Sequence, residues 1–181
     1  TIWSPNINLF RDPRWGRVME GAGEDPFLGA AIAIARVRGF QGDDLSAEDT
    51  IAATLKHFAA YGFAEAGKDY NAADVGTVTL NNIILPPFRA AIEGANARTV
   101  MNSFNTLNAI PATADSALQR GLLKGEWGFS GFVVSDWGSG VEMIDHGFAQ
   151  DKRDAARLSM IGGSDMDMES LVYAPHLPAL V

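Results

Sequence analysis

The stretch GFVVSDW at positions 131–137 is the most informative segment for the fold of this chain. Its apolar residues, Phe132 to Val134, predict a strand that is buried on both faces, as in a parallel sheet covered by helices. The strand is followed by Asp136, and (β/α) barrels carry their functional side chains at the carboxyl ends of their strands. Asp136 is therefore a candidate catalytic carboxylate. The alternative is a helix N-cap, because residues 138–146 favour a short helix.

Outward from this stretch, strand and helix patterns alternate along the whole chain. The double proline Pro86-Pro87 is expected to kink or split one of the helices, because it removes two amide donors. Regular alternation predicts an α/β fold with a parallel sheet. The predicted strands cover residues 7–10, 50–58, 99–104, 131–136 and 164–168, and the predicted helices cover residues 26–39, 77–94, 114–127, 138–146 and 151–162.

The alternation fits a barrel or an open doubly wound sheet, and the polar residues distinguish the two. A dinucleotide-binding sheet needs a glycine-rich turn directly after its first strand, whereas Gly21-Ala22-Gly23 lies in a loop. Polar residues instead follow several strands, among them Arg17, Lys56-His57 and Asp136. A site built from many strand ends favours a TIM-like (β/α)8 barrel. About five βα units cannot close eight strands, so we expect residues 1–181 to form an incomplete barrel without its early strands.

Composition sets limits on the class of protein. The 181 residues are 47% hydrophobic and 20% charged, which is ordinary for a globular domain. The net charge of −8 gives no support for a nucleic-acid partner. No apolar run approaches the roughly 18 residues that span a bilayer, and no signal peptide is recognisable. The absence of cysteine excludes disulfides and thiolate metal sites.

Seven segments together resemble glycoside hydrolase family 3, and within it the bacterial β-glucosidases of the periplasmic type. They occur in the order and at the spacing of that family and cover essentially the whole chain. The segments are SPNINLFRDPRWGRVMEGAGEDP (4–26), KHFAAYG (56–62), DYNAADV (69–75), LPPFRAAIEGA (85–95), VMNSFNTLNAIPAT (100–113), KGEWGFSGFVVSDWG (124–138) and GSDMDM (163–168).

The resemblance implies a retaining, exo-acting β-glycosidase that needs no cofactor and no metal. Its nucleophile corresponds to Asp136, which would form a covalent glycosyl-enzyme. A flat tryptophan beside it, Trp137, offers an apolar face to a sugar ring. The resemblance also implies that Glu20 holds the sugar-binding arginine by an ion pair. The implied substrate-binding residues are Arg17, Lys56, His57, Lys68, Met101, Phe104 and Trp137.

In this family the barrel is followed by an α/β sandwich domain, which carries the glutamate that acts as acid and base. The resemblance therefore implies that residues 1–181 are part of the barrel, that the sandwich domain is their partner in the same polypeptide, and that the fragment alone has little activity. The expected substrates are β-linked oligosaccharides or aryl and alkyl glycosides. The expected location is periplasmic or secreted. Two alternatives are a β-xylosidase and a non-catalytic sugar-binding barrel in which Asp136 only holds a hydroxyl.

Each assignment also has a plainer alternative when it is taken by itself. Arg17 has glutamates close by in sequence and is open to a simple surface ion pair. Lys56 and His57 are open to a structural polar pair, and Met101 to ordinary core packing. Asp165 and Asp167 alternate with methionines, but an oxygen-ligated metal site needs more ligands than these two.

Overall fold

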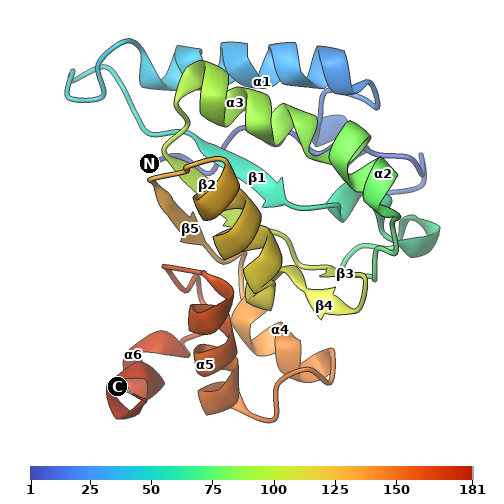
Figure 1. Ribbon diagram of the computed structural model, residues 1–181, viewed down its shortest axis with the longest axis vertical. Helices are drawn as coiled ribbons and strands as arrows, with labels where there is room; N and C mark the ends of the chain where they lie inside the picture. The colour runs from blue at the N-terminus through green and yellow to red at the C-terminus, as the bar shows by residue number, and fades with distance from the viewer. Residues whose placement is uncertain (181) are drawn as a thin grey trace.

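A small parallel sheet forms the centre of the molecule (Figure 1). The computed structural model describes residues 1–180. A segment at residues 2–6 adds short bridges to the free edge of the first strand, and Met166 bridges to the last strand. Five parallel segments therefore lie side by side in chain order. The named strands of this sheet are, in spatial order, β1 (Thr54–Phe58), β2 (Thr99–Asn102) and β5 (Phe132–Val134).

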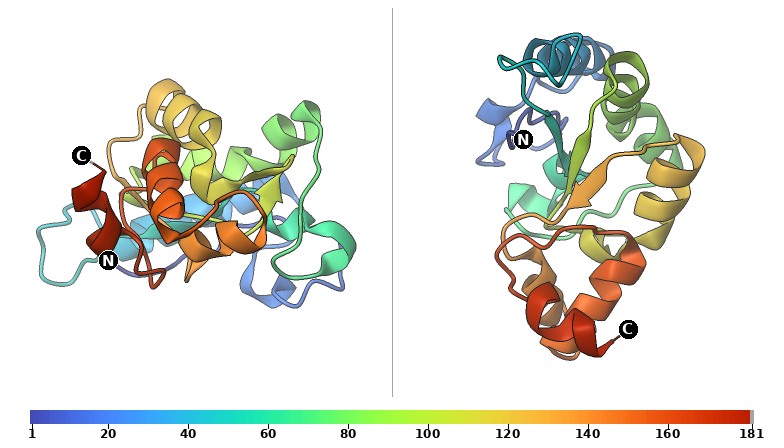
Figure 2. Two further views of the ribbon diagram at one scale, coloured as in Figure 1. Left: turned by 90° about the horizontal axis from the view of Figure 1, so that it is seen from below. Right: turned by 90° about the vertical axis from the view of Figure 1, so that its left-hand side faces the viewer.

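Helices cover the outside of these strands, and Figure 2 shows them as an arc around one side of the sheet. Helices α1 and α3 pack against each other along their length. The α/β prediction is confirmed, and the arrangement is that of an incomplete TIM-like barrel. None of the described helices is long and apolar enough to cross a lipid bilayer. The helices are α1 (Pro26–Gln41), α2 (Thr77–Thr79), η4 (Leu80–Ile84), α3 (Pro86–Ala95), η6 (Ala117–Glu126), α4 (Ser139–Asp145), α5 (Lys152–Gly162) and α6 (Tyr173–His176).

Short elements lie in the connections between strands and helices. A two-stranded hairpin follows β2, and single helical turns lie in several of the loops. The hairpin strands are β3 (Thr106–Leu107) and β4 (Ile110–Pro111), and the single turns are η1 (Val18–Glu20), η2 (Tyr61–Phe63), η3 (Glu65–Gly67), η5 (Ala112–Ala114) and η7 (Leu177–Ala179).

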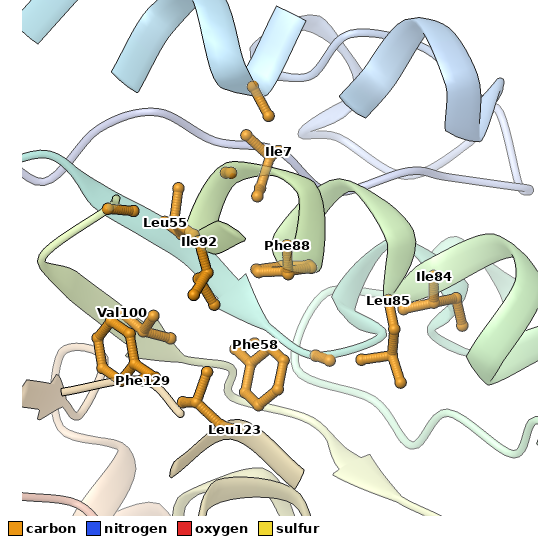
Figure 3. Packing of buried hydrophobic residues seen from close by; sticks show 14 of the residues in the cluster. Ile7, Leu55, Phe58, Ile84, Leu85, Phe88, Ile92, Val100, Leu123 and Phe129 are labelled. Carbon is orange, nitrogen blue, oxygen red and sulfur yellow. The ribbon is translucent and has the colours of Figure 1, made fainter. Parts of the chain in front are cut away.

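The main hydrophobic core lies between the sheet and the helices (Figure 3). Phe58 from β1 and Phe88 from α3 meet edge to face with ring centroids 5.1 Å apart. Val100 and Val133 are completely buried in neighbouring strands, as the continuous apolar runs predict. Each large side chain buried here contributes roughly 1.5–3 kcal/mol. This core fixes the strands whose ends carry the polar residues.

Helix boundaries follow local sequence signals. Helix α1 begins at Pro26, and the Asp25 side chain accepts a hydrogen bond from the Leu28 amide at 2.7 Å, which is an N-cap. The predicted interruption at Pro86-Pro87 is confirmed, because η4 ends at Ile84 and α3 begins at Pro86. The missing amide donors of the prolines explain the break.

Two expectations need correction, and one element was not expected. The first strand lies at residues 2–6 rather than 7–10, since the sheet bridges are at Ile2 and Asn6. Asp136 is not a helix N-cap: α4 has Gly138 in that place, with a φ of 70°. The hairpin of β3 and β4 is not predicted, because its turn residues are Asn-Ala rather than the Asn-Gly typical of such turns.

Candidate active site

Side chains from distant parts of the sequence meet at the carboxyl ends of the parallel strands. Asp136 comes two residues after β5, His57 belongs to β1, and Met101 belongs to β2. Arg17, just before η1, places its guanidinium carbon 5.4 Å from the centre of the Tyr61 ring in η2. A loop and three strands therefore contribute to one cluster, as expected for a barrel.

Asp136 is buried, with 7% of its surface exposed. Its Oδ1 accepts a hydrogen bond from the Trp137 amide at 2.7 Å. Its Oδ2 lies 3.2 Å from His57 Nε2, yet it is in hydrogen-bond alignment with no group among residues 1–180. Burial raises the pKa of Asp136 to about 6, although the Trp137 amide and the charges of Arg17 and Lys56 lower it. One carboxylate oxygen is held in place while the other keeps its lone pairs free.

His57 acts beside this carboxylate as a neutral group. Its side chain is 1% exposed, and its Nδ1 lies 2.8 Å from the side-chain nitrogen of Asn8. Burial, followed by the positive charges of Arg17 and Lys56, lowers the pKa of His57 well below its usual value. The imidazole therefore places no positive charge beside Asp136.

Arg17 is held rigidly by the ion pair with Glu20 that the resemblance implies. Its Nε and Nη2 donate to the two carboxylate oxygens of Glu20, both at 2.8 Å. Asn6 donates a further hydrogen bond to Glu20 Oε2 at 3.1 Å. The Arg17 side chain is only 22% exposed. Glu20 is 43% exposed, so the pair lies partly open to solvent, but three hydrogen bonds hold it in place. The hydrogen bond to Glu20 raises the pKa of Arg17.

Lys56 is half-buried, and it lies within electrostatic range of three charged site residues. Burial and then the charge of Arg17 lower the pKa of Lys56, whereas the carboxylates of Asp136 and Glu20 raise it. The Lys56 ammonium group therefore has both a cationic neighbour, Arg17, and anionic neighbours, Asp136 and Glu20. Lys56 is therefore a local source of positive charge beside Asp136.

The remaining predicted residues differ in their surroundings. Met101 and Phe104 are buried, and the Phe104 ring packs edge to face on Tyr70 with centroids 4.7 Å apart. Trp137 is 64% exposed, so its ring is accessible beside Asp136. Lys68 is exposed on a loop, and its side chain makes no ion pair with any residue from 1 to 180. The structure thus places Arg17, Lys56 and His57 around Asp136, and it puts Lys68 on the loop that also carries Tyr70.

The structure adds carboxylates that sequence reasoning missed. Glu142 in the first turn of α4 has a buried Oε2, and burial raises its pKa to about 7, helped by the charges of Asp145, Asp136 and Asp69. Asp69 accepts a hydrogen bond from Trp15 Nε1 at 2.8 Å. A glutamate at helical spacing after a strand gives no sequence signal of burial, so only the fold could reveal it.

Other acidic and basic residues have structural partners. Asp165 forms an ion pair with Lys124 at 2.6 Å and accepts a hydrogen bond from the Val133 amide. Asp167 accepts a hydrogen bond from the Val172 amide at 2.8 Å. These contacts orient both aspartates toward protein groups. No group of three potential metal ligands occurs among residues 1–180.

The hollows on the outside of the molecule lie away from this cluster. One of about 280 Å³ is lined by Arg38, Gln41 and Arg98, among others. Gln41 bonds to the amide of Ala53, just before β1, and Arg98 directly precedes β2. This hollow therefore lies at the amino ends of the strands, where barrel enzymes do not carry their chemistry.

The geometry of the cluster suits a substrate rich in hydroxyl groups, with attack by a carboxylate on one of its carbon atoms. Asp136 provides a buried carboxylate oxygen with free lone pairs, and neutral donors and cations surround it. Arg17 provides a fork of donors, which suits two adjacent hydroxyl groups. The exposed ring of Trp137 provides an apolar wall. These are the components for binding a sugar ring and for nucleophilic catalysis at it.

Comparisons with known proteins give matches over almost the whole chain. The model of the glycosyl hydrolase family 3 N-terminal domain matches residues 1–179. A periplasmic beta-glucosidase of Salmonella typhimurium is 42% identical over 179 residues, which is 99% of this chain and 23% of that protein. A beta-xylosidase/alpha-L-arabinofuranosidase of Medicago sativa is 37% identical over 94% of this chain and 23% of its own length.

A solved structure shows the same fold. The crystal structure of a beta-glucosidase from Listeria innocua superposes with a TM-score of 0.96 at 46% identity, covering 99% of this chain and 25% of that one. A mutant of the Listeria enzyme has been solved in complex with laminaribiose. This chain thus spans about a quarter of the length of the relatives that it matches.

Proposed function

Because this chain belongs to glycoside hydrolase family 3, we propose that its polypeptide is a retaining exo-β-glycosidase of the β-glucosidase type. The observation that carries the proposal is the buried Asp136 carboxylate at the end of β5, with Oδ2 3.2 Å from His57 Nε2 and free of hydrogen bonds from residues 1–180. The relatives named beta-glucosidase and the laminaribiose complex of the Listeria enzyme support a terminal β-glucosyl substrate.

In the proposed mechanism Asp136 Oδ2 attacks the anomeric carbon, the bond to the leaving oxygen breaks, and a covalent glycosyl-enzyme forms. Arg17 and Lys56 bind hydroxyl groups of the sugar, and His57 donates a hydrogen bond to a sugar hydroxyl without changing its own charge. A second carboxyl group protonates the leaving oxygen and then activates the water that releases the sugar. By family resemblance this group is a glutamate in an α/β sandwich domain outside residues 1–181.

The pKa of Asp136 is compatible with this role. At about 6 it leaves the carboxylate mostly ionised at pH 7, and acidification below 6 removes the nucleophile. The positive charges of Arg17 and Lys56 favour the ionised form. We accordingly expect the reaction of the free enzyme to lose rate as the pH falls through 6.

The experiment uses the full-length polypeptide and a dinitrophenyl 2-deoxy-2-fluoro-β-glucoside, whose good leaving group needs little acid assistance. The expected result is a stable adduct on Asp136, detected by peptide mass spectrometry. The variant Asp136→Asn should give no adduct, whereas Glu93→Gln, on the outer face of α3, should be labelled as the wild type. Sugar binding without any adduct would support the alternative of a non-catalytic sugar-binding barrel.

The relatives named beta-xylosidase provide a specific reason to test a second sugar. Glucose and xylose differ by one hydroxymethyl group, so the corresponding 2-fluoro-xyloside is the matched probe. Faster labelling by the xyloside would assign the polypeptide to the β-xylosidases. The proposed location is periplasmic or secreted, following the name of the Salmonella relative.

A further inference from the structure

Two asparagines in the segment SPNIN, Asn6 and Asn8, have no role in the mechanism so far, although they are buried beside the site. Asn8 is 2% exposed and Asn6 is 6% exposed. Buried amides must satisfy their hydrogen bonds, and each bond has a fixed direction because an amide nitrogen donates and an amide oxygen accepts. The directions of these bonds therefore determine the state of the groups that they contact.

The contacts of Asn8 determine which nitrogen of His57 carries the proton. The backbone amide of His57 donates to Asn8 Oδ1 at 3.1 Å, and a backbone amide can only donate. The opposite end of the Asn8 amide, its Nδ2, therefore faces His57 Nδ1 at 2.8 Å. Because Nδ2 can only donate, Nδ1 must accept, and the single proton of the neutral ring lies on Nε2.

The same logic continues to the sugar-binding arginine. The Asn8 backbone amide donates to Asn6 Oδ1 at 3.0 Å, so Asn6 Nδ2 is free to donate to Glu20 Oε2 at 3.1 Å. Glu20 then accepts both hydrogen bonds of Arg17. Every link in this series from His57 to Arg17 has one possible direction. We call the five residues His57, Asn8, Asn6, Glu20 and Arg17 the asparagine relay.

We infer that Asn8 is a positioning residue, which holds His57 as the neutral Nε2–H tautomer. The ring then turns an N–H group, and not a lone pair, toward Asp136 and donates to substrate hydroxyls. This inference rests on the proposed function of Asp136 as nucleophile. The opposite tautomer would point the Nε2 lone pair at the carboxylate 3.2 Å away and repel it. The titratable groups that face His57 are Asp136, Arg17, Lys56 and Tyr61.

The most direct test is Asn8→Asp, which preserves the shape and the acceptor for the His57 backbone amide. The new carboxylate cannot donate to Nδ1, so the proton must move to Nδ1 or the ring must become an imidazolium. The rate of labelling by the fluoroglucoside should then fall roughly 10- to 100-fold at high pH, where the donor toward Asp136 is lost. As the pH falls toward 6, above the range in which Asp136 itself becomes protonated, the imidazolium should restore part of the rate, giving a new ionisation that the wild type lacks.

The matched control is Asn6→Asp, the same chemical change two residues away. It disturbs the link to Glu20 but leaves the contact between Asn8 and His57 intact. It should slow labelling at all pH values, because two carboxylates then face each other. The ionisation that this pair adds should leave the ¹⁵N signals of His57 as in the wild type. A uniform loss of rate in Asn8→Asp, parallel to that of Asn6→Asp, would mean that Asn8 is only structural and would overturn the inference.

A measurement on the unmodified protein keeps the inference testable if Asn8→Asp does not fold. Labelling of histidine with ¹⁵N in the full-length polypeptide, with a His57→Gln variant for assignment, identifies the His57 signals. The expected result is an Nδ1 without a proton between roughly pH 5 and 9. A proton on Nδ1 would overturn the inference. Failure of the wild type to form an adduct on Asp136 would instead overturn the proposed function, with the tautomer still measured independently.

Discussion

At the scale of single residues, the site depends on a carboxylate that is held in an unfavourable environment. Asp136 is buried, and its pKa is raised to about 6 from the ordinary value of 3.8. A carboxyl group whose pKa is higher in the folded state stabilises the fold only while it is protonated, below about pH 4. The benefit is lost as the pH rises through 6. Ionised Asp136 therefore destabilises the protein under the conditions in which it is proposed to act.

We accordingly expect Asp136→Asn to be more stable than the wild type above pH 6. Its free energy of unfolding should be higher by roughly 1–3 kcal/mol. Urea unfolding at pH 8 and at pH 4 measures this, and the difference should vanish at pH 4. The control Asp154→Asn should be less stable than the wild type at pH 8, because hydrogen bonds from Arg157 lower the pKa of Asp154. Equal stability of Asp136→Asn and wild type at pH 8 would contradict the burial argument.

Sequence reasoning identified Asp136 and the basic residues of the site, and it missed Glu142 and the amides that orient the site. Asp136 was recognised because an aspartate directly follows an apolar run. Asn8 gave no such signal, because its partner His57 is 49 positions away and the contact depends on the pairing of residues 2–6 with β1. Glu142 was missed because its burial depends on the packing of α4.

At the scale of elements, the turn between β5 and α4 positions Asp136. Gly138 adopts a φ of 70° as the N-cap of α4, which lets the chain turn sharply after Trp137. Non-glycine residues adopt this left-handed region at a cost. No atom lies within 4 Å of a Cβ added at Gly138, so any effect of a substitution arises from the backbone alone.

Gly138→Ala should therefore lower the free energy of unfolding by roughly 1–2 kcal/mol, measured by urea denaturation. It should also slow labelling of Asp136, because a distorted turn at Gly138 would shift Asp136, which lies two residues earlier in the chain. Gly76→Ala is the matched control, since that site is equally open but has a φ of −68°. An unchanged stability of Gly138→Ala would show that the turn relaxes without strain.

The elements were predictable where the signal was local. The Asp25 cap of α1 and the break at Pro86-Pro87 follow from single residues. The hairpin of β3 and β4 was not predictable, because Asn108 and Ala109 both adopt positive φ values without the glycine that usually marks such turns. Tertiary packing there overrides local preference.

At the scale of the whole molecule, five parallel segments form one arc of a barrel, and the chain spans about a quarter of the relatives that it matches. The sequence predicted this incompleteness, because about five strands cannot close an eight-stranded barrel. We propose that residues 1–181 carry the nucleophile and part of the sugar pocket, whereas an α/β sandwich domain carries the acid and base.

Residues 1–181 expressed alone should accordingly show little or no hydrolysis of nitrophenyl β-glucoside. The missing proton donor affects poor leaving groups most. A release assay with nitrophenyl and alkyl glucosides measures this, and circular dichroism with the same sample serves as the folding control. Turnover by the folded fragment at the rate of intact relatives would contradict the proposed division of roles.

The asparagine relay has a consequence for protein engineering. Each of its bonds has only one permitted direction, so no member is free to change its chemistry without a matching change in its neighbour. Replacing Arg17 alone to change the recognition of the sugar would remove the two hydrogen bonds that Glu20 accepts from it, and it would leave Asn6 as the remaining donor to Glu20. Residues 6, 8, 17, 20 and 57 should instead be replaced together as one set.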